Sequence, residues 1–570
     1  MIAFSRAVPS LFRVSANIGT ILNPSLELIP NSSGNAHRVS IVNRRTRPSL
    51  ARLAVSAREY VLDCFRIDAR SLAVFRILVG VLIVADVFLR ARNFSFYYTD
   101  GGVVTQRVAR ENTPEYAISV YYLTSDPSLI AGLLGLQVLF ALALIVGYRT
   151  RTATILSFLF VVSLDHHNPF VLSYADTLFR LLLFWAIFLP LGERWSVDAV
   201  HADRVPRRSV VGVASALALG QMVFMYVLNG VHKSESALWR SGEAAPLVFG
   251  IDEMTFLLGD VLREFPTLLT YGGMLWFYML LGGWLLVALR GRLRLPLLVL
   301  FVGGHLSFAL TVRIGAFAYV ALAGLALFVP AAFWQDGRRL CRRLGVDPVE
   351  VVPWETLRRV ARSLPDRQLG PERFDVLKRV VATVTLALVV VALGMIVAVL
   401  VLNAGAIVDD GSYDQHRLNH EVAETPGGEY VHMTAESLGI VQPEWSVFAP
   451  QPRTTDRYYV FGAQTTDGDR LDVFNDREFT WDRPDAQLQT QHDTYRQRFF
   501  MNSVRRSGPD DELPANFGDH ICTVYADEHD VELSHIRMFE VTEEITLDTL
   551  DRPTDRETDT EHIYRHTCSD

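Results

Sequence analysis

The 570-residue chain is half hydrophobic, and its mean hydropathy of +0.21 lies above the range that is usual for soluble proteins. Its net charge of −8 hides an asymmetry, because residues 403–570 hold 35 acidic and 14 basic residues whereas the preceding part is basic. The composition excludes a wholly soluble chain and predicts a basic membrane part followed by an acidic, water-facing part. An acidic surface with only two lysines beside 52 arginines favours a halophilic, haloarchaeal source, with a GC-rich genome as the alternative.

The first 60 residues are rich in serine and arginine and contain no apolar core long enough for a signal peptide. We interpret residues 1–60 as a disordered extension or as the product of a misassigned start codon. The membrane domain is then predicted to occupy residues 61–403.

Apolar runs of about 20 residues predict seven membrane spans, since a helix of this length crosses the hydrocarbon core. The seven runs are residues 71–89, 129–147, 210–230, 268–289, 295–312, 314–334 and 380–402. Two shorter runs, 152–164 and 178–191, predict either a tight pair of spans or a re-entrant hairpin. The fold class that follows is an all-α polytopic membrane helix bundle of about nine spans.

Arginines in every second connection predict the orientation of this bundle in the cell membrane. Arginine-rich stretches lie before the first span and after the second, fourth, sixth and eighth, at residues 44–66, 149–151, 194–208, 290–294 and 338–343. The amino terminus and these loops are therefore predicted to be cytoplasmic. The extracytoplasmic face then holds residues 97–102, His166, Lys233, Arg313 and the whole carboxy-terminal part.

Residues 404–570 are predicted to form a small, acidic, β-rich extracytoplasmic domain. Apolar runs at 458–461 and 471–474 flank Asp467 and Gly468, which is typical of a β-hairpin. Cys522 and Cys568 lie in this domain and could pair there. No metal-ligand spacing occurs, so no metal site is predicted, and the short basic loops give no support for a nucleic-acid partner.

Ionisable residues inside membrane spans are costly, by roughly 2.5–3.5 kcal/mol each on insertion scales, and are therefore candidates for function. Asp176 and Arg180 lie four residues apart, so a helix would place them on one face as an ion pair. Arg76 and Asp86 of the first span do not face each other, and each needs a partner elsewhere. The run from 165 to 169 fits either a polar functional cluster or a solvated turn.

One of the two lysines, Lys233, lies where the fifth span reaches the outer face. A desolvated lysine can lose its proton whereas a guanidinium cannot, so a lysine kept in an arginine-rich chain indicates a base. The alternative is an interfacial lysine that extends its side chain toward water. His305 lies in the middle of the seventh span, where a histidine either packs or takes part in chemistry, and Arg313 follows at its outer end.

Several short motifs occur in an order that resembles one known family, from about residue 65 to residue 476. They are Phe75-Arg76-Ile77, Gly147-Tyr148-Arg149, Trp195-Ser196-Val197-Asp198, Asn229-Gly230-Val231-His232-Lys233, His305 with Ile314-Gly315-Ala316-Phe317-Ala318-Tyr319, and Trp445-Ser446-Val447-Phe448-Ala449-Pro450. On these motifs the chain resembles the vitamin K-dependent gamma-carboxylase-like membrane family, also called the horizontally transferred transmembrane domain (HTTM) family.

The animal enzymes of this family carboxylate glutamate side chains, and they couple this reaction to oxygenation of vitamin K hydroquinone to its epoxide. The resemblance implies a reduced quinone of the vitamin K or menaquinol type, with O2 and CO2 as co-substrates. It implies that Lys233 is the base toward the quinol and that His167 and His305 assist. His166, Asn168 and Arg313, which are predicted on the same outer face, are candidates for holding the quinone.

Departures from the animal enzymes limit what the resemblance implies. Those enzymes carry an asparagine shortly after the last histidine, where Leu306 and Ser307 follow here, and a second lysine at the position of His232. Their lumenal part is also much longer. We therefore predict a quinol-dependent, lyase-like membrane enzyme whose partners are lipid, quinone and a secreted or membrane-bound protein substrate. The alternative is a non-catalytic multispan assembly or secretion factor, or a carrier.

Overall fold

The computed structural model describes residues 50–568, apart from 203, 346–353, most of 366–423, 426, 486 and 509. Residues 57–570 form one compact unit. The predictions for residues 1–49 and for the span at 380–402 fall wholly or largely outside the described residues.

Within the described residues, five helices are long and apolar enough to cross a membrane. They are α2 (Ala69–Ala91), α5 (Pro127–Val146), α9 (Val213–Ser234), α13 (Pro266–Leu281) with its continuation through η4 (Gly282–Trp284) and α14 (Leu285–Ala288), and α15 (Arg294–Thr311) with the preceding turn η5 (Gly291–Leu293). Each coincides with a predicted apolar run. The chain is therefore a membrane protein with a helical membrane part, as predicted.

The predicted span at 314–334 is not one straight helix. Helix α16 (Phe317–Leu325) and turn η6 (Ala326–Phe328) end before Pro330, and α17 (Ala331–Arg343) leaves at an angle of 91°. Proline has no backbone N–H to donate and restricts the residue before it, so the helix stops there. If this bent pair counts as one span, the described residues contain up to six candidate spans, so the predicted nine are not confirmed.

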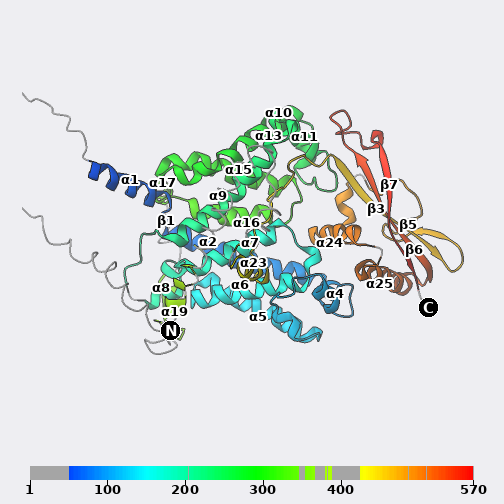
Figure 1. Cartoon of the computed structure of the whole chain (residues 1–570), viewed down its shortest axis with the longest axis horizontal. Coiled ribbons are helices and arrows are strands. Elements are labelled where there is room, and N and C mark those ends of the chain that lie inside the picture. The colour runs from blue at the N-terminus through cyan, green and yellow to red at the C-terminus, as the bar shows by residue number, and fades with distance from the viewer. Residues whose placement is uncertain are drawn as a thin grey trace, which may run out of the picture. The chain divides into compact units, whose positions relative to one another are not determined.

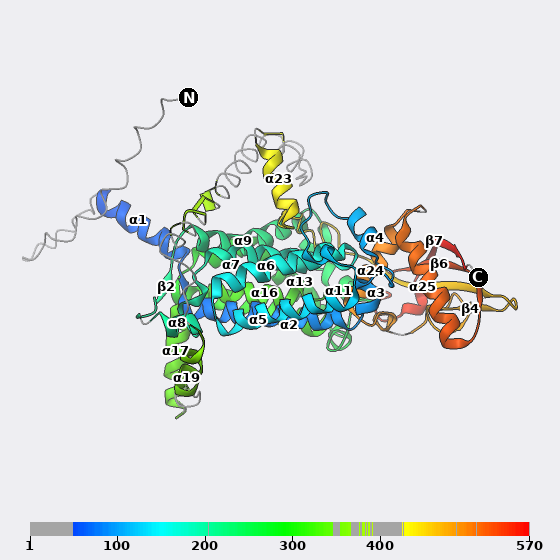
Figure 2. The ribbon, with the colours of Figure 1, turned by 90° about the horizontal axis from the view of Figure 1, so that it is seen from below.

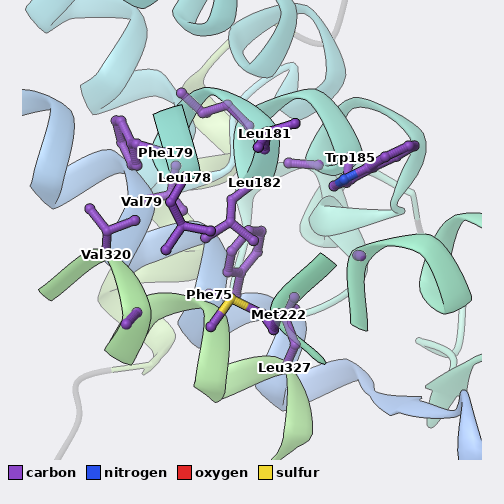
Figure 3. Packing of buried hydrophobic residues seen from close by; sticks show 14 of the residues in the cluster. Phe75, Val79, Leu178, Phe179, Leu181, Leu182, Trp185, Met222, Val320 and Leu327 are labelled. Carbon is purple, nitrogen blue, oxygen red and sulfur yellow. The ribbon is translucent and has the colours of Figure 1, made fainter. Parts of the chain in front are cut away.

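The two short apolar runs form helices α6 (Thr150–His167) and α7 (Tyr174–Phe188), which are joined through turn η2 (Pro169–Val171). Helix α7 is buried on almost every side, as expected for a helix that is hydrophobic all round. Figure 3 shows its Leu178 and Leu182 among side chains from α2, α9, α16 and η6, which include Phe75, Val79, Met222, Val320 and Leu327. The centre of the hydrophobic core thus lies around α7.

The carboxy-terminal part contains a five-stranded antiparallel sheet of order β5-β4-β3-β6-β7. The strands are β3 (Thr455–Thr465), β4 (Arg470–Asp472), β5 (Arg477–Glu478), β6 (Leu533–Glu544) and β7 (Thr558–Thr567). The predicted hairpin is confirmed as β3 and β4, with Gly468 in the left-handed region at φ 99°. The predicted disulfide between Cys522 and Cys568 is also present.

Helices α24 (Tyr495–Arg506) and α25 (Glu512–His529) pack with the sheet, and this layer shares a core with the loops of the helical bundle. Phe461 of β3 and Phe500 of α24 belong to the same buried cluster as Tyr97 of α3 (Phe94–Tyr98) and Val108 of α4 (Gln106–Glu111). Figures 1 and 2 both show the sheet beside the end of the bundle that carries α4 and α11 (Ala244–Phe249). Helices α17, α8 (Val197–His201) and α19 (Trp354–Ser363) lie at the other end.

Candidate functional site

Lys233 lies in the last turn of α9, and its side chain is buried, with 2% of its surface exposed. Its ammonium donates hydrogen bonds to the backbone carbonyls of Val447 and, at 3.1 Å, Phe448, and it lies 4.1 Å from the centre of the Trp239 ring. No carboxylate forms an ion pair with it among the residues that the structure describes. The interpretation of Lys233 as an interfacial residue that reaches water is therefore wrong.

The carbonyls that accept hydrogen bonds from Lys233 belong to the motif Trp445-Ser446-Val447-Phe448, which is distant in sequence but contacts α9. Asn229, one helical turn before Lys233, donates to the carbonyls of Trp445 at 2.6 Å and Val447 at 3.1 Å. The Trp239 indole donates to the Phe448 carbonyl at 2.8 Å. Trp445 and Phe448 have φ values of 53° and 52°, which aromatic residues rarely adopt, so these contacts hold an unusual backbone conformation.

His305 is fully buried in the middle of α15. Its Nε2 lies 2.9 Å from the hydroxyl of Tyr226, and its ring meets the Trp276 ring edge to face at 5.4 Å. Tyr226 precedes Lys233 by seven residues on α9, which is two helical turns, so the two side chains lie on the same side of this helix.

Lys233 and His305 line the same cavity, which has a volume of about 630 Å³. The other lining side chains are mostly aliphatic and aromatic and come from α9, α13, α15 and the motif at 445–448. Leu268 and Leu275 of α13 and Val299 and Leu300 of α15 also line it and are largely exposed, so the cavity reaches the outer surface of the bundle between these two helices. The site is an apolar cavity whose few polar groups include Lys233, Asn229 and the Tyr226–His305 pair.

The predicted cluster His166, His167 and Asn168 lies elsewhere, at the end of α6, and does not line this cavity. All three residues are buried, so the interpretation of a solvated turn is wrong. His166 Nδ1 lies 3.0 Å from the Ile118 carbonyl, His167 Nε2 lies 3.5 Å from the Tyr98 carbonyl, and the Asn168 amide donates to the Tyr97 carbonyl at 3.2 Å. These contacts join α6 to the loops around α3.

Arg313 also lies outside the residues that line the cavity, although its neighbours Val312 and Ile314 belong to them. Its guanidinium donates to the carbonyls of Gln489 at 2.7 Å and Asp493 at 3.0 Å. Arg313 therefore fastens the end of α15 to the acidic carboxy-terminal part.

The partly buried Asp86 of α2 and the buried Asp165 of α6 and Asp176 of α7 belong to one ion cluster, which the analysis of each span by itself does not predict. Arg90 pairs with Asp165 at 2.5 Å and with Asp86 at 2.8 Å. The predicted pair Asp176–Arg180 is wrong in its partners, because Arg180 instead meets Asp165 at 2.9 Å and Asp176 accepts from Arg496 at 3.0 Å. The partners are distant in sequence, so helical spacing gave no signal for them. The prediction that Asp86 needs a partner elsewhere is confirmed, since Arg496 of α24 also pairs with it.

The motifs that contain Arg76, Arg149 and Asp198 contact one another at the end of the bundle where α8 lies. Arg76 is fully buried and donates to the carbonyls of Trp195 at 2.6 Å and Leu191 at 3.0 Å, which confirms its need for partners outside α2. The Asp198 carboxylate accepts from the backbone N–H of Arg149 at 2.8 Å and of Thr150 at 2.7 Å. These motifs therefore stabilise the fold and are not part of the cavity.

Comparison with protein families finds a match to the HTTM domain over residues 65–334. No curated protein and no solved structure matches the chain. The matched residues include α2 to α16, and with them Lys233, Tyr226 and His305. Residues 65–334 therefore form an HTTM domain.

Proposed function

We propose that this protein is a vitamin K-dependent gamma-carboxylase-like membrane enzyme that couples the oxidation of a reduced quinone by O2 to carboxylation or a related modification. The observation that carries the proposal is that Lys233 and His305, which lie on different helices, line one apolar cavity. The HTTM domain supports the assignment to a carboxylase-related membrane family.

The cavity suits a quinol better than a polar metabolite. Its volume of about 630 Å³ lies within the range of roughly 300–1,000 Å³ typical of small-molecule sites, and its walls are mostly apolar. Lys233 is one polar group of the lining, and the Tyr226–His305 pair is another. An apolar cavity with two polar positions can bind a ring that carries two hydroxyl groups. The cavity reaches the outer surface of the bundle between α13 and α15, which suits a ligand that enters from the lipid.

In this proposal Lys233 takes the hydroxyl proton of the quinol. A base must be neutral to accept a proton, and burial away from any carboxylate is the environment in which a lysine can lose its own. The Val447 and Phe448 carbonyls and the Trp239 ring then stabilise the ammonium that results. When bound, the quinol and one O2 supply the oxidation, which yields one epoxide and one water.

His305 and Tyr226 would orient the ring at the other polar position, because their mutual hydrogen bond fixes both side chains. The roles implied for His167, His166, Asn168 and Arg313 remain predictions, and their contacts favour support of the outer loops over contact with the quinone.

We also propose that the amino terminus is cytoplasmic and that the acidic carboxy-terminal domain is extracytoplasmic. Support comes from the gathering of basic connections at one end of the bundle, where Arg294 donates to the Cys64 carbonyl and Arg292 pairs with Asp336. The sheet and helices α24 and α25, which belong to the acidic carboxy-terminal part, lie beside the other end of the bundle (Figure 1). Membrane lipid, quinone, CO2 and a secreted or membrane-bound protein substrate are the proposed partners.

A non-catalytic role as an assembly or secretion factor, or as a carrier, is the second candidate. It is favoured by the fact that the polar contacts of Lys233 also fasten the motif at 445–448 to α9. The two functions are separated by incubating the purified, full-length protein with menaquinol-type quinols and O2 and measuring quinone epoxide. Formation of epoxide in proportion to the protein concentration supports the catalytic function. Absence of turnover with every quinol tested contradicts it.

A further inference from the structure

A second group of buried and partly buried charges lies against the sheet, between β3, β6, α24 and the loop that follows α11. We call it the arginine cluster, and it consists of Arg453, Arg457, Arg498, Arg505, Glu253 and Glu540. Arg498 and Arg505 are seven residues apart on α24 and share one face of it with Asn502, which accepts from Arg457 of β3 at 2.9 Å. The helix therefore presents both arginines to the sheet.

The two glutamates are shared among the arginines. Glu253 pairs with Arg453 at 2.5 Å and lies 3.8 Å from Arg457. Glu540 of β6 meets Arg457 at 3.3 Å and Arg505 at 3.4 Å. Two carboxylates thus face four guanidiniums.

Arg498 is the arginine of the cluster that forms no ion pair with Glu253 or Glu540. Its side chain is buried, with 6% of its surface exposed, and it stacks on the Phe499 ring at 4.8 Å. Its guanidinium forms no ion pair or hydrogen bond with any residue that the structure describes. A buried guanidinium without an anionic partner is strongly unfavourable.

Two enclosed nitrogens of this region have neither a hydrogen-bond partner nor an ion-pair partner within the described chain. They are Nε of Arg498 and Nδ1 of His492. Buried polar groups are nearly always satisfied, so unsatisfied nitrogens beside an unpaired guanidinium indicate an additional bound species.

The charges around the arginine cluster do not neutralise its excess of positive charge. Asp252, Asp456 and Glu543 next to the cluster are matched by three arginines of their own, Arg263, Arg483 and Arg556. Burial alone would raise the pKa of Glu253, but Arg453, Arg498 and Arg457 outweigh it and lower this pKa to about 2, so Glu253 is already ionised. Burial lowers the pKa of His492 to about 4, so it adds no charge near neutrality.

We propose that the arginine cluster binds a small oxoanion of carboxylate, bicarbonate or phosphate geometry, with the guanidinium of Arg498 as its principal ligand. Two neighbouring guanidiniums in a water-poor site match the paired oxygens of such an anion, which a lysine could not. The site is separate from the Lys233 cavity, and the proposal does not depend on the proposed function. The anion would join the loop of Glu253 to the sheet and α24.

The test is the thermal unfolding of purified, full-length protein in detergent, titrated with bicarbonate, phosphate or a glutamyl peptide against chloride at constant ionic strength. An anion that binds the folded state raises the midpoint with concentration, by about 1–2 °C for a tenfold excess over its dissociation constant in a unit of this size. A response to bicarbonate or phosphate identifies a free anion, and a response to the peptide alone identifies a carboxylate side chain. Either supports the site.

Arg498→Met should abolish the response, while Arg506→Met should keep it, because Arg506 lies exposed on the same helix. Arg498→Lys, which keeps the charge without the forked geometry, should weaken the response if the methionine variant fails to fold. The proposal is overturned if no anion shifts the wild-type midpoint beyond the chloride control, or if the Arg498 variants respond like wild type.

Discussion

The Arg496 guanidinium of α24 lies 3.0 Å from the Asp176 carboxylate of α7, so the carboxy-terminal part completes an ion cluster that belongs to the helical bundle. Without Arg496, Arg90 and Arg180 would face the aspartates at 86, 165 and 176. Burial and the positive charge of Arg90 lower the pKa of Arg496. The negative charges of Asp86 and Asp176 outweigh these effects, so the pKa of Arg496 is raised. The two parts of the chain are therefore linked by charge as well as by apolar packing.

This link predicts that Arg496→Met destabilises the whole unit by about 3–5 kcal/mol, which is the usual effect of removing one partner of a buried ion pair. Arg505→Met serves as a comparison on the same helix, because the ion pair of Arg505 is with Glu540 of the sheet. Thermal unfolding in detergent with probes in both parts measures the effect. Loss of stability confined to the sheet, with the bundle unaffected, would contradict the proposed link.

Glu253 gives a prediction about pH, because its folded pKa of about 2 lies below its ordinary value of 4.5. A carboxylate with a lowered pKa stabilises the folded state above the ordinary value, and this stability is lost as the pH falls from about 4.5 through 2. Glu253→Gln should therefore be less stable than wild type at pH 7, by about 3 kcal/mol, and the difference should shrink below pH 4.5.

The measurement is the difference in unfolding free energy between the two proteins from pH 7 to pH 2.5. Asp456 lies nearby with a pKa raised to about 6 by burial and by the charges of Asp252 and Glu253, so each protein alone shows a mixed profile. Because Glu253→Gln also removes a charge that raises the pKa of Asp456, the part of the difference that changes below pH 4.5 is the part that reports on Glu253. A difference that stays constant over this range would show that the carboxylate is not held in its charged form.

The helices of the bundle could be predicted because apolar runs of sufficient length form helices wherever lipid or protein surrounds them. The break before Pro330 also had a signal in the sequence, namely the proline itself, which the apolar run concealed. The partners of Asp165, Asp176 and Lys233 had no such signal. They join residues far apart in the chain, and in the case of Lys233 the partners are backbone carbonyls, which no side-chain pattern reveals.

The place of the site was only partly predictable for the same reason. Lys233 and His305 were recognisable as ionisable residues in apolar helices, and the structure brings them to one cavity. Tyr226, Asn229 and Trp239 were missed, although their spacing from Lys233 on or beside α9 would have placed them near it. His167 was expected beside them, but α6 ends against the loops around α3.

The cavity predicts a separation between long-tailed and short-tailed quinols. Gly303 lines the cavity on α15, and a Cβ added there meets no atom within 4 Å, so Gly303→Phe should fold and fill space between α13 and α15. We expect KM for a long-tailed menaquinol to rise at least tenfold, with a smaller effect on a tailless quinol. Gly132→Phe on α5 is the matched control, because it also has free space and does not line the cavity. Equal effects on both quinols would argue against lateral entry here.

Lys233→Arg separates a catalytic lysine from a structural one. Arginine can still donate to the carbonyls of Val447 and Phe448, and its longer side chain can extend into the adjoining cavity, so the fold should be kept. A guanidinium cannot become a neutral base, so epoxide formation should fall by about 10²–10⁴-fold, the usual contribution of general-base catalysis. Epoxide is measured with purified wild type and variant at equal concentration, and matched unfolding midpoints establish that both are folded. A folded variant as active as wild type would remove Lys233 from the chemistry and leave it the role of fastening the motif at 445–448 to α9.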